Sequence, residues 1–283
     1  ICCTTGVDLR ASLSDLLEAD KRRRVDGAPP MRRVVVETTG IADPAPVVNQ
    51  IVPGGMPALG LRDHTVARTF TLAGVAATVD ALAGAATLEA HPECVRQVAF
   101  ADRIVLTKTD MAGPDGAEAI ARLRATRADI NPAATILDRH DPATRIADVL
   151  APRPYAPADL GADVERWLAA DRAAGPRDQH GHHDHAHDHA HGHGHHGVRT
   201  VAIETDVPVA TGDLSNFLDL LHIAAGPRLL RLKGLVRLAE EPERPLVLQV
   251  VQHAVHPLAR LDAWPSEDRR TRVVAIVRDL SEE

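Results

Sequence analysis

Residues 101–113 read ADRIVLTKTDMAG, in which a short apolar run from Arg103 to Leu106 passes directly into the polar sequence Thr107-Lys108-Thr109-Asp110. An apolar run of this length, bounded by polar residues, is typical of a strand buried in a parallel sheet. Elements of alternating type surround it, and we predict helices over 92–101 and 116–128 and strands over 71–79 and 134–137. Strands that alternate with helices predict a doubly wound α/β domain.

A second apolar run, Val34-Val35-Val36, comes before Glu37-Thr38-Thr39-Gly40 and predicts another strand of the same sheet. It lies between a predicted helix over 7–20 and a predicted helix over 43–53, where Asp43-Pro44 is a favourable helix start. Ligands of open α/β sheets bind at the carboxyl ends of the strands. We therefore expect Glu37 and Asp110 to end neighbouring strands, so that one magnesium nucleotide touches both.

The chain changes character after residue 150. Residues 151–174 are rich in Pro, Ala and Asp, and residues 180–196 read HGHHDHAHDHAHGHGHH, a low-complexity sequence without an apolar face. Strands are predicted again at 198–205, 229–237, 246–251 and 272–278, with a helix from Gly212 to Leu221. The predicted organisation is an α/β domain over 1–150, a linker over 151–197 and a small α+β domain with an antiparallel sheet over 198–283.

The composition limits the class of protein. The 283 residues carry a formal net charge of −7, which argues against a generic nucleic-acid binder because no basic excess is available to neutralise phosphates. No apolar run approaches a membrane span of about 18 residues. Three cysteines, two of them adjacent, do not form a disulfide framework. We expect a reducing, cytoplasmic location, with neither nucleic acid nor membrane as a partner.

The sequence Thr107-Lys108-Thr109-Asp110 is compatible with recognition of a nucleobase. A carboxylate after a parallel strand accepts two hydrogen bonds from guanine, at N1 and the exocyclic N2, and adenine does not supply this pair of donors. Losing such bonds costs on the order of 10⁴-fold in discrimination. The Lys108 stem can lie along the base. The general guanine motif has Asn where Thr107 stands, and a solvated surface loop is the alternative interpretation.

Glu37 and Gly40 stand where P-loop NTPases place an acidic residue near Mg²⁺ and a glycine N–H near the γ-phosphate. We take these two residues as the candidates for the catalytic end of the site. The alternative is an ordinary turn after a strand.

Two groups of residues are candidate transition-metal ligands. Cys2 and Cys3 stand near a predicted helix start, where the thiol pKa is lowered, although two thiolates do not complete a tetrahedral zinc site. The second group holds ten of the sixteen histidines and suits Zn²⁺, Ni²⁺, Co²⁺ or Cu²⁺ as a flexible sink: His180, His182, His183, His185, His187, His189, His191, His193, His195 and His196. His253 and His256 invite the same interpretation, but structural roles are favoured for them. Cys94 is interpreted as a buried helix residue.

Taken together, these segments resemble the CobW-type metal-handling GTPases, relatives of the nickel-insertion GTPases for urease and hydrogenase. The matching segments run in family order: ICC at 1–3, VVVETTGIADPAPV at 34–47, ADRIVLTKTDMAG at 101–113, RLLRLKGLV at 228–236, LQVVQHAVHP at 248–257 and LDAWPSEDRRTRVVAIVRDL at 261–280. The resemblance implies a P-loop NTPase-like parallel sheet, then a small α+β domain. It also implies GTP and Mg²⁺ as cofactors. Zinc is the first choice of metal because thiolates with imidazole suit it, with cobalt or nickel otherwise. The C-terminal sequence holds no recognised catalytic constellation, so we expect it to bind a client metalloprotein, with a homo-oligomer as a further option.

One family feature is absent from this sequence. The family opens with a G-x-x-G-x-G-K-T-type phosphate loop, whereas no Gly-Lys-Ser/Thr occurs here and Ile1 falls inside the family's C-x-C-C motif. We expect a longer protein that hydrolyses GTP, and a fragment that does not. Cobalt handling in cobalamin biosynthesis and a non-enzymatic His-rich metal buffer are the alternative functions. Asn131, before the strand at 134–137, is a further candidate for the loop that contacts the base.

Overall fold

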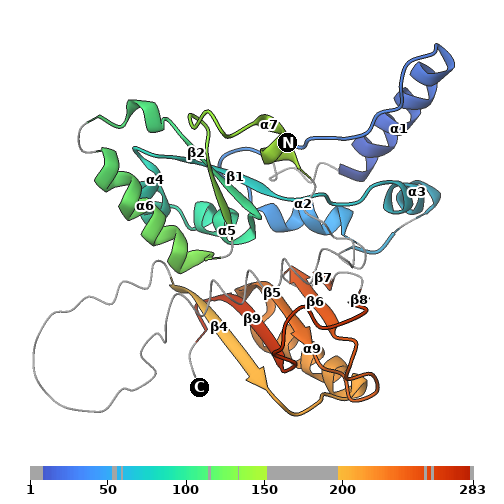
Figure 1. The fold of residues 1–283 in the computed structure, drawn as a ribbon. Coiled ribbons are helices and arrows are strands. Elements are labelled where there is room, and N and C mark those ends of the chain that lie inside the picture. Colours follow the sequence, from blue (N-terminus) through green and yellow to red (C-terminus); the bar gives the residue numbers. More distant parts are fainter. Residues whose placement is uncertain are drawn as a thin grey trace, which may run out of the picture.

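The computed structural model describes residues 9–52, 56–58, 60–113, 116–132, 134–151, 197–251, 254–255 and 258–280. Cys2, Cys3, the ten histidines of the 180–196 run, His253 and His256 lie outside the described residues. Figure 1 shows two bodies, an α/β part built from residues before 151 and a second part built around an antiparallel sheet.

The first part contains a parallel sheet of three strands in the order β1-β2-β3. The strands are β1 (Ala76–Asp80), β2 (Arg103–Thr107) and β3 (Thr135–Asp138). Arg103 pairs with Ala76 on one side and with Thr135 on the other, so β2 is central. Its first four residues are buried, as predicted for a strand covered on both faces. The predicted α/β fold is confirmed.

Helices connect and cover these strands: α4 (Gly84–Ala90), α5 (Pro92–Phe100), α6 (Gly116–Ile130) and α7 (Ile146–Leu150). Pro92 opens α5 at a position where its missing N–H has no intrahelical partner. Val95, Val98 and Phe100 of α5 pack in the same apolar core as Ile104 and Leu106 of β2. The predicted helices over 92–101 and 116–128 are confirmed.

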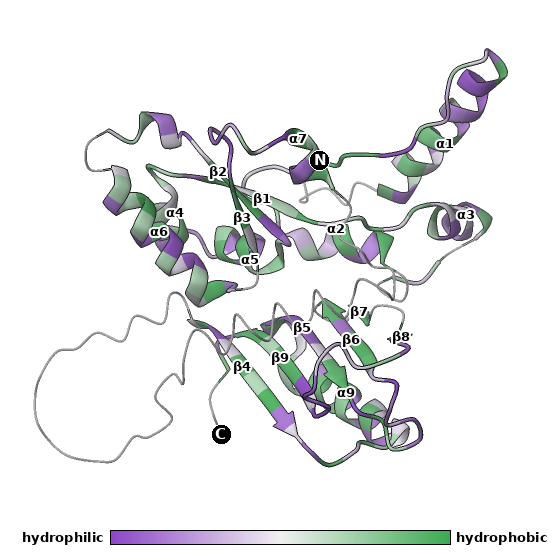
Figure 2. Ribbon diagram, in the orientation of Figure 1, coloured by the Kyte–Doolittle hydropathy of each residue, from purple (hydrophilic) through white to green (hydrophobic). Residues whose placement is uncertain are grey.

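Three further helices lie beside the sheet: α1 (Leu9–Val25), α2 (Pro44–Ile51) and α3 (Leu61–Thr69). The predicted start of α2 is confirmed, since the Asp43 side chain caps it by accepting from Ala45 N at 3.0 Å. The free end of α1 projects from the body and is strongly hydrophilic (Figures 1 and 2). No described helix is long and apolar enough to cross a membrane.

The predicted strand at Val34-Val35-Val36 is wrong. These residues have no strand assignment, and Val35 is 65% exposed, whereas Val34 and Val36 pack against a small cluster of Leu9, Leu13 and Val66. The alternation of inward and outward side chains fits an extended segment. A strand also requires a hydrogen-bonded neighbour, and no described strand pairs with this segment. The apolar run therefore reflects the partial burial of Val34 and Val36, and neither full burial nor strand pairing follows from it.

The second part is an antiparallel sheet in the order β4-β9-β5-β6-β7, with β8 paired to β6. Its strands are β4 (Val198–Thr205), β5 (Leu229–Val236), β6 (Leu246–Val251), β7 (Ala254–Val255), β8 (Ala259–Arg260) and β9 (Thr271–Arg278). Helix α9 (Thr211–Ala225) precedes β5 through the 3-10 helix η4 (Gly226–Arg228). The predicted strand–helix–strand order is confirmed.

Both faces of this sheet are covered, because every residue of β5 and β6 is buried. Leu232, Leu248 and Val273 pack on one face with Leu214 of α9. On the other face, Leu235 and Ile276 share a core cluster with residues of α5. The α/β part therefore packs on the sheet where an isolated antiparallel sheet would meet water.

Gly234 lies in β5 close to the backbone of β9. A Cβ at this position would lie 2.4 Å from the Arg272 carbonyl oxygen and 2.7 Å from the Val273 Cα. Because both atoms are backbone, Gly234→Ala is expected to destabilise the protein by about 1–3 kcal/mol, measured by urea unfolding. Gly212→Ala in α9 is the control, since nothing lies within 4 Å of its added Cβ. Equal midpoints for the two variants would contradict this reading of the β5–β9 contact.

Candidate functional site

The carboxyl ends of the three parallel strands meet at one edge of the sheet. In the strand register Asp80 lies opposite Thr107, and Leu106 lies opposite Asp138. The polar sequence after β2 is therefore flanked by the acidic residues that end β1 and β3. In an open α/β sheet this edge is where ligands bind.

Lys108 turns the chain sharply after β2. It adopts a left-handed conformation with φ of 58°, and its Nζ lies 2.5 Å from Asp80 Oδ2. The other carboxylate oxygen of Asp80 accepts from the backbone N–H groups of Leu82 at 2.8 Å and Ala83 at 3.2 Å. The hydrogen bond from Lys108 is the main reason that the pKa of Asp80 is lowered. Asp80 thus holds Lys108 and orders the turn after β1.

Thr109 is held from the opposite side by the end of β3. Its hydroxyl donates to Asp138 Oδ1 at 2.7 Å, and the same oxygen accepts from the His140 N–H at 2.8 Å. Burial favours a higher pKa for Asp138, but these hydrogen bonds outweigh it and the pKa is lowered. The loop after β2 is therefore anchored on both flanks.

Asp110 is the acidic side chain of this edge that projects outward. Its side chain is 53% exposed, and its Oδ1 lies 3.0 Å from His140 Nε2. Asp80 and Asp138 already receive hydrogen bonds from two or more donors each, whereas the Asp110 carboxylate is open to a ligand on its exposed side. Thr107, by contrast, directs its hydroxyl to the Val79 carbonyl at 3.4 Å.

Glu37 and Gly40 lie in an exposed segment before α2, not at the end of a strand. The prediction that Glu37 ends a strand next to that of Asp110 is therefore wrong. The turn that follows is fastened to α5, because Gln97 Nε2 donates to the carbonyls of Gly40 at 3.0 Å and Ala42 at 2.8 Å. Arg96 Nε also lies 3.0 Å from Asp43 Oδ2. That one nucleotide touches both Glu37 and Asp110 stays a prediction.

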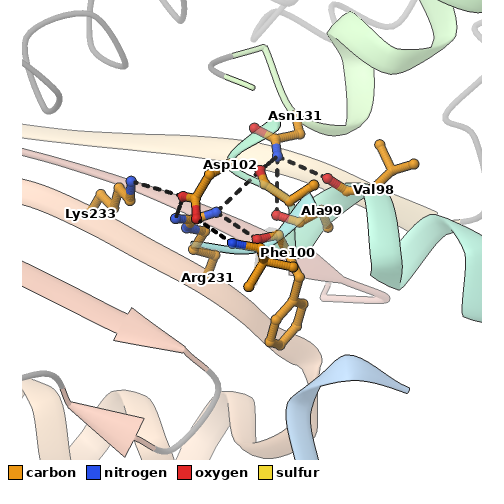
Figure 3. Close-up of polar contacts among 9 residues, drawn as sticks. Val98, Ala99, Phe100, Asp102, Asn131, Arg231 and Lys233 are labelled. Carbon is orange, nitrogen blue, oxygen red and sulfur yellow. Dashed lines mark hydrogen bonds and ion pairs between the residues drawn. The ribbon is translucent and has the colours of Figure 1, made fainter. Parts of the chain in front are cut away.

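Asn131 does not belong to the base-contacting edge. It is 1% exposed, and its Nδ2 donates to the carbonyls of Val98, Ala99 and Ala101 at 2.9, 3.2 and 2.9 Å (Figure 3). The last carbonyls of a helix have no intrahelical donors, and Asn131 supplies them for α5. The candidate role for Asn131 is therefore wrong, because its side chain is buried and its amide nitrogen is bound in the core.

The described residues contain no metal centre. No group of three or more His, Cys, Asp or Glu among them is placed to hold an ion. Cys94 is half-buried in α5, and burial raises the pKa of its thiol, which makes it a poor thiolate ligand. The predicted ligands in the 1–8 and 180–196 segments lie outside the described part of the chain.

Sequence reasoning missed three residues of this edge, namely Asp80, Asp138 and His140. Asp80 and Asp138 could have been found from the sequence, because each directly follows a predicted strand and ends the strand observed there. His140 carries no sequence pattern, and it enters the site because the turn after β3 brings its ring to Asp110.

The fold resembles that of a solved GTPase. The structure superposes on the crystal structure of the Zn(II)-bound YjiA GTPase from Escherichia coli with a TM-score of 0.62 and 22% identity, covering 94% of this chain and 72% of that one. A Zn(II)-bound triple mutant of the same GTPase matches with the same values.

Two family models match the sequence. The CobW/HypB/UreG nucleotide-binding domain matches residues 1–138, and the cobalamin synthesis protein cobW C-terminal domain matches residues 198–283. The chain belongs to the CobW family. It is also 27% identical over 284 residues to the zinc chaperone YjiA of Escherichia coli (strain K12), a match that covers 100% of this chain and 76% of that protein.

Proposed function

We propose that this protein is a GTP-dependent metallochaperone whose cargo is a transition metal, with zinc as the first choice. Membership of the CobW family and the similarity to a protein named as a zinc chaperone support the metal-handling role. The nucleotide part of the proposal depends on the edge of the parallel sheet.

The observation that carries the nucleotide role is the exposed Asp110 carboxylate, on a loop whose neighbouring residues are fixed. Lys108 and Thr109 are held by Asp80 and Asp138, so the loop is ordered without a ligand. A preorganised carboxylate loses less entropy when it accepts the two guanine donors. Lys108 and Thr107 would line the base, and Glu37 and Gly40 would serve the phosphate and Mg²⁺ end.

The metal role falls to residues beyond the described ranges. Cys2 and Cys3 would hold zinc as thiolates together with at least one further ligand. The ten histidines between 180 and 196 would form a weaker reservoir with many interchangeable ligands. The C-terminal domain, which brings no recognised catalytic group, would contact the client metalloprotein.

The test separates a chaperone from a histidine buffer. The variant is made in protein expressed from the complete reading frame, with the ten linker histidines replaced by serine at unchanged length. This variant is expected to keep one tight zinc site and selective GTP hydrolysis. Cys2→Ser with Cys3→Ser is expected to weaken zinc binding, measured against a chromophoric chelator, by about 10²-fold or more. Loss of all zinc binding in the serine linker, with GTP and ATP turned over equally, would establish the buffer instead.

Cobalt is the alternative cargo, and the family name of the C-terminal domain favours it. Competition between Zn²⁺ and Co²⁺ for the thiolate site distinguishes the two. Zinc is expected to win because soft thiolate ligands select Zn²⁺. Release of bound metal to a client, in proportion to GTP turned over, decides which ion is delivered.

A further inference from the structure

The turn between α5 and β2 is bound to the C-terminal sheet by a buried arginine. Arg231 of β5 donates from Nη1 to the carbonyls of Phe100 at 2.8 Å and Ala101 at 3.3 Å, and from Nη2 to Asp102 Oδ1 at 2.6 Å. Figure 3 shows this contact, with Lys233 approaching the same carboxylate at 3.9 Å. The Arg231 and Asp102 side chains are 6% and 4% exposed, so the contact lies inside the protein.

The arginine supplies what the end of α5 lacks. A helix C-terminus leaves carbonyls without donors and carries partial negative charge. An arginine guanidinium supplies both the N–H donors and a positive charge. Asn131 satisfies part of this set from within the α/β part, and Arg231 completes it from the C-terminal sheet. The placement of α5 therefore depends on both parts of the protein.

The Asp102 carboxylate, next to the carboxyl end of α5, stays charged. Burial alone would raise the pKa of Asp102, but the charges of Arg231 and Lys233 outweigh it and hold the pKa well below its usual range. Asp102 Oδ2 also accepts from Val75 N at 2.9 Å, just before β1. The ion pair thus keeps the arginine in place over the whole physiological pH range.

The same helix holds the segment that contains Gly40. Gln97 binds the carbonyls of Gly40 and Ala42, and Arg96 pairs with Asp43 at the start of α2. Gln97 and Phe100 are one helical turn apart, about 4.5 Å along the axis. A single short helix therefore contacts residues 40–43 with one turn and the C-terminal domain with the next.

We propose that Arg231 is a positioning residue for residues 37–43, acting through α5, so that the C-terminal domain and this segment respond to one another. The inference rests on the proposed function only in taking residues 37–43 as the phosphate side of the site. Val95 and Val98 pack in the core, so α5 shifts as one body when its carboxyl end is released. By thermodynamic reciprocity, a ligand that orders 37–43 also stabilises the Arg231 contact.

Amide hydrogen exchange over residues 37–47 tests the inference without nucleotide. Arg231→Met is expected to accelerate amide exchange over residues 37–47 by about tenfold. Opening of this segment together with α5 then no longer requires the charge-assisted bonds of Arg231 to break. Leu235→Ala is the matched control, since Leu235 is buried on the same strand in the shared core but has no donor for α5. Arg231→Lys keeps the charge but lacks the paired guanidinium N–H groups. Its exchange rate over residues 37–47 is expected to lie between those of the wild type and Arg231→Met.

The second set of variants removes the contacts between α5 and residues 40–43. With Arg96→Ala and Gln97→Ala present, exchange over 37–47 rises, and adding Arg231→Met is expected to raise it no further. Should Arg231→Met fail to fold, Arg231→Lys replaces it in both comparisons. The inference is overturned if exchange over 37–47 in the Arg231 variant equals that in Leu235→Ala, or if the effects at the two ends simply add. If GTP does not bind, the proposed function is wrong, but the exchange result still tests the coupling because it is measured without nucleotide.

Discussion

Replacing Asp110 by alanine is expected to remove the preference for guanine over adenine nucleotides, a change on the order of 10⁴-fold in the affinity ratio. The structure explains why this carboxylate has no substitute at the site. Asp80 and Asp138 flank the same loop, but both oxygens of Asp80 and Oδ1 of Asp138 already accept from Lys108, Thr109 and backbone N–H groups. Neither can turn to meet a base without releasing the loop.

The measurement is competition of GTP and ATP against a fluorescent guanine nucleotide, with protein from the complete reading frame. Asp141→Ala is the matched control, because Asp141 lies on the exposed turn after β3 and binds the backbone N–H of Ala143 at 2.8 Å. Its guanine preference is expected to equal that of the wild type. Asp110→Asn retains one acceptor and presents an amide to the remaining donor, so we expect it to resemble the alanine variant. A guanine preference that survives in Asp110→Ala would place base recognition elsewhere.

The sequence predicted best where a local pattern and the tertiary environment require the same thing. The run from Arg103 to Leu106 is apolar because β2 is central and covered on both faces, so its pattern and its burial agree. Asp43-Pro44 starts α2 because the cap and the proline act within one turn of the helix. The strands β5, β6 and β9 of the C-terminal domain were predicted for the same reason, because they too are apolar and buried.

Prediction failed where the deciding partner is distant in the chain. Val34-Val35-Val36 has the composition of a strand, but strand pairing depends on a neighbour that composition does not reveal. Asn131 has the residue type of a base-contacting loop, yet its amide is used by α5, some thirty residues earlier. Arg231 and Asp102 are separated by 129 positions, and nothing in either local sequence indicates their contact.

Asp102→Ala is expected to destabilise the protein by about 3–5 kcal/mol, the usual cost of leaving a buried charge without its partner. The loss has two components. Arg231 and Lys233 remain in the interior without the Asp102 carboxylate, and the Val75 N–H loses its acceptor. Urea unfolding measures the change, with Asp262→Ala as control. Asp262 pairs with Arg244 at 3.3 Å but is fully exposed, and its removal is expected to cost less than about 1 kcal/mol.

The combination of Asp102→Ala with Arg231→Met distinguishes a paired charge from simple packing. If the cost of Asp102→Ala comes mainly from the orphaned guanidinium, removing that guanidinium relieves it, and the double variant loses less stability than the sum of the single variants. Independent, additive losses would instead show that each side chain acts through its own backbone contacts. A loss in Asp102→Ala no larger than in Asp262→Ala would mean that water reaches the pair, and the rigid connection between α5 and the C-terminal sheet would then be weaker than its burial implies.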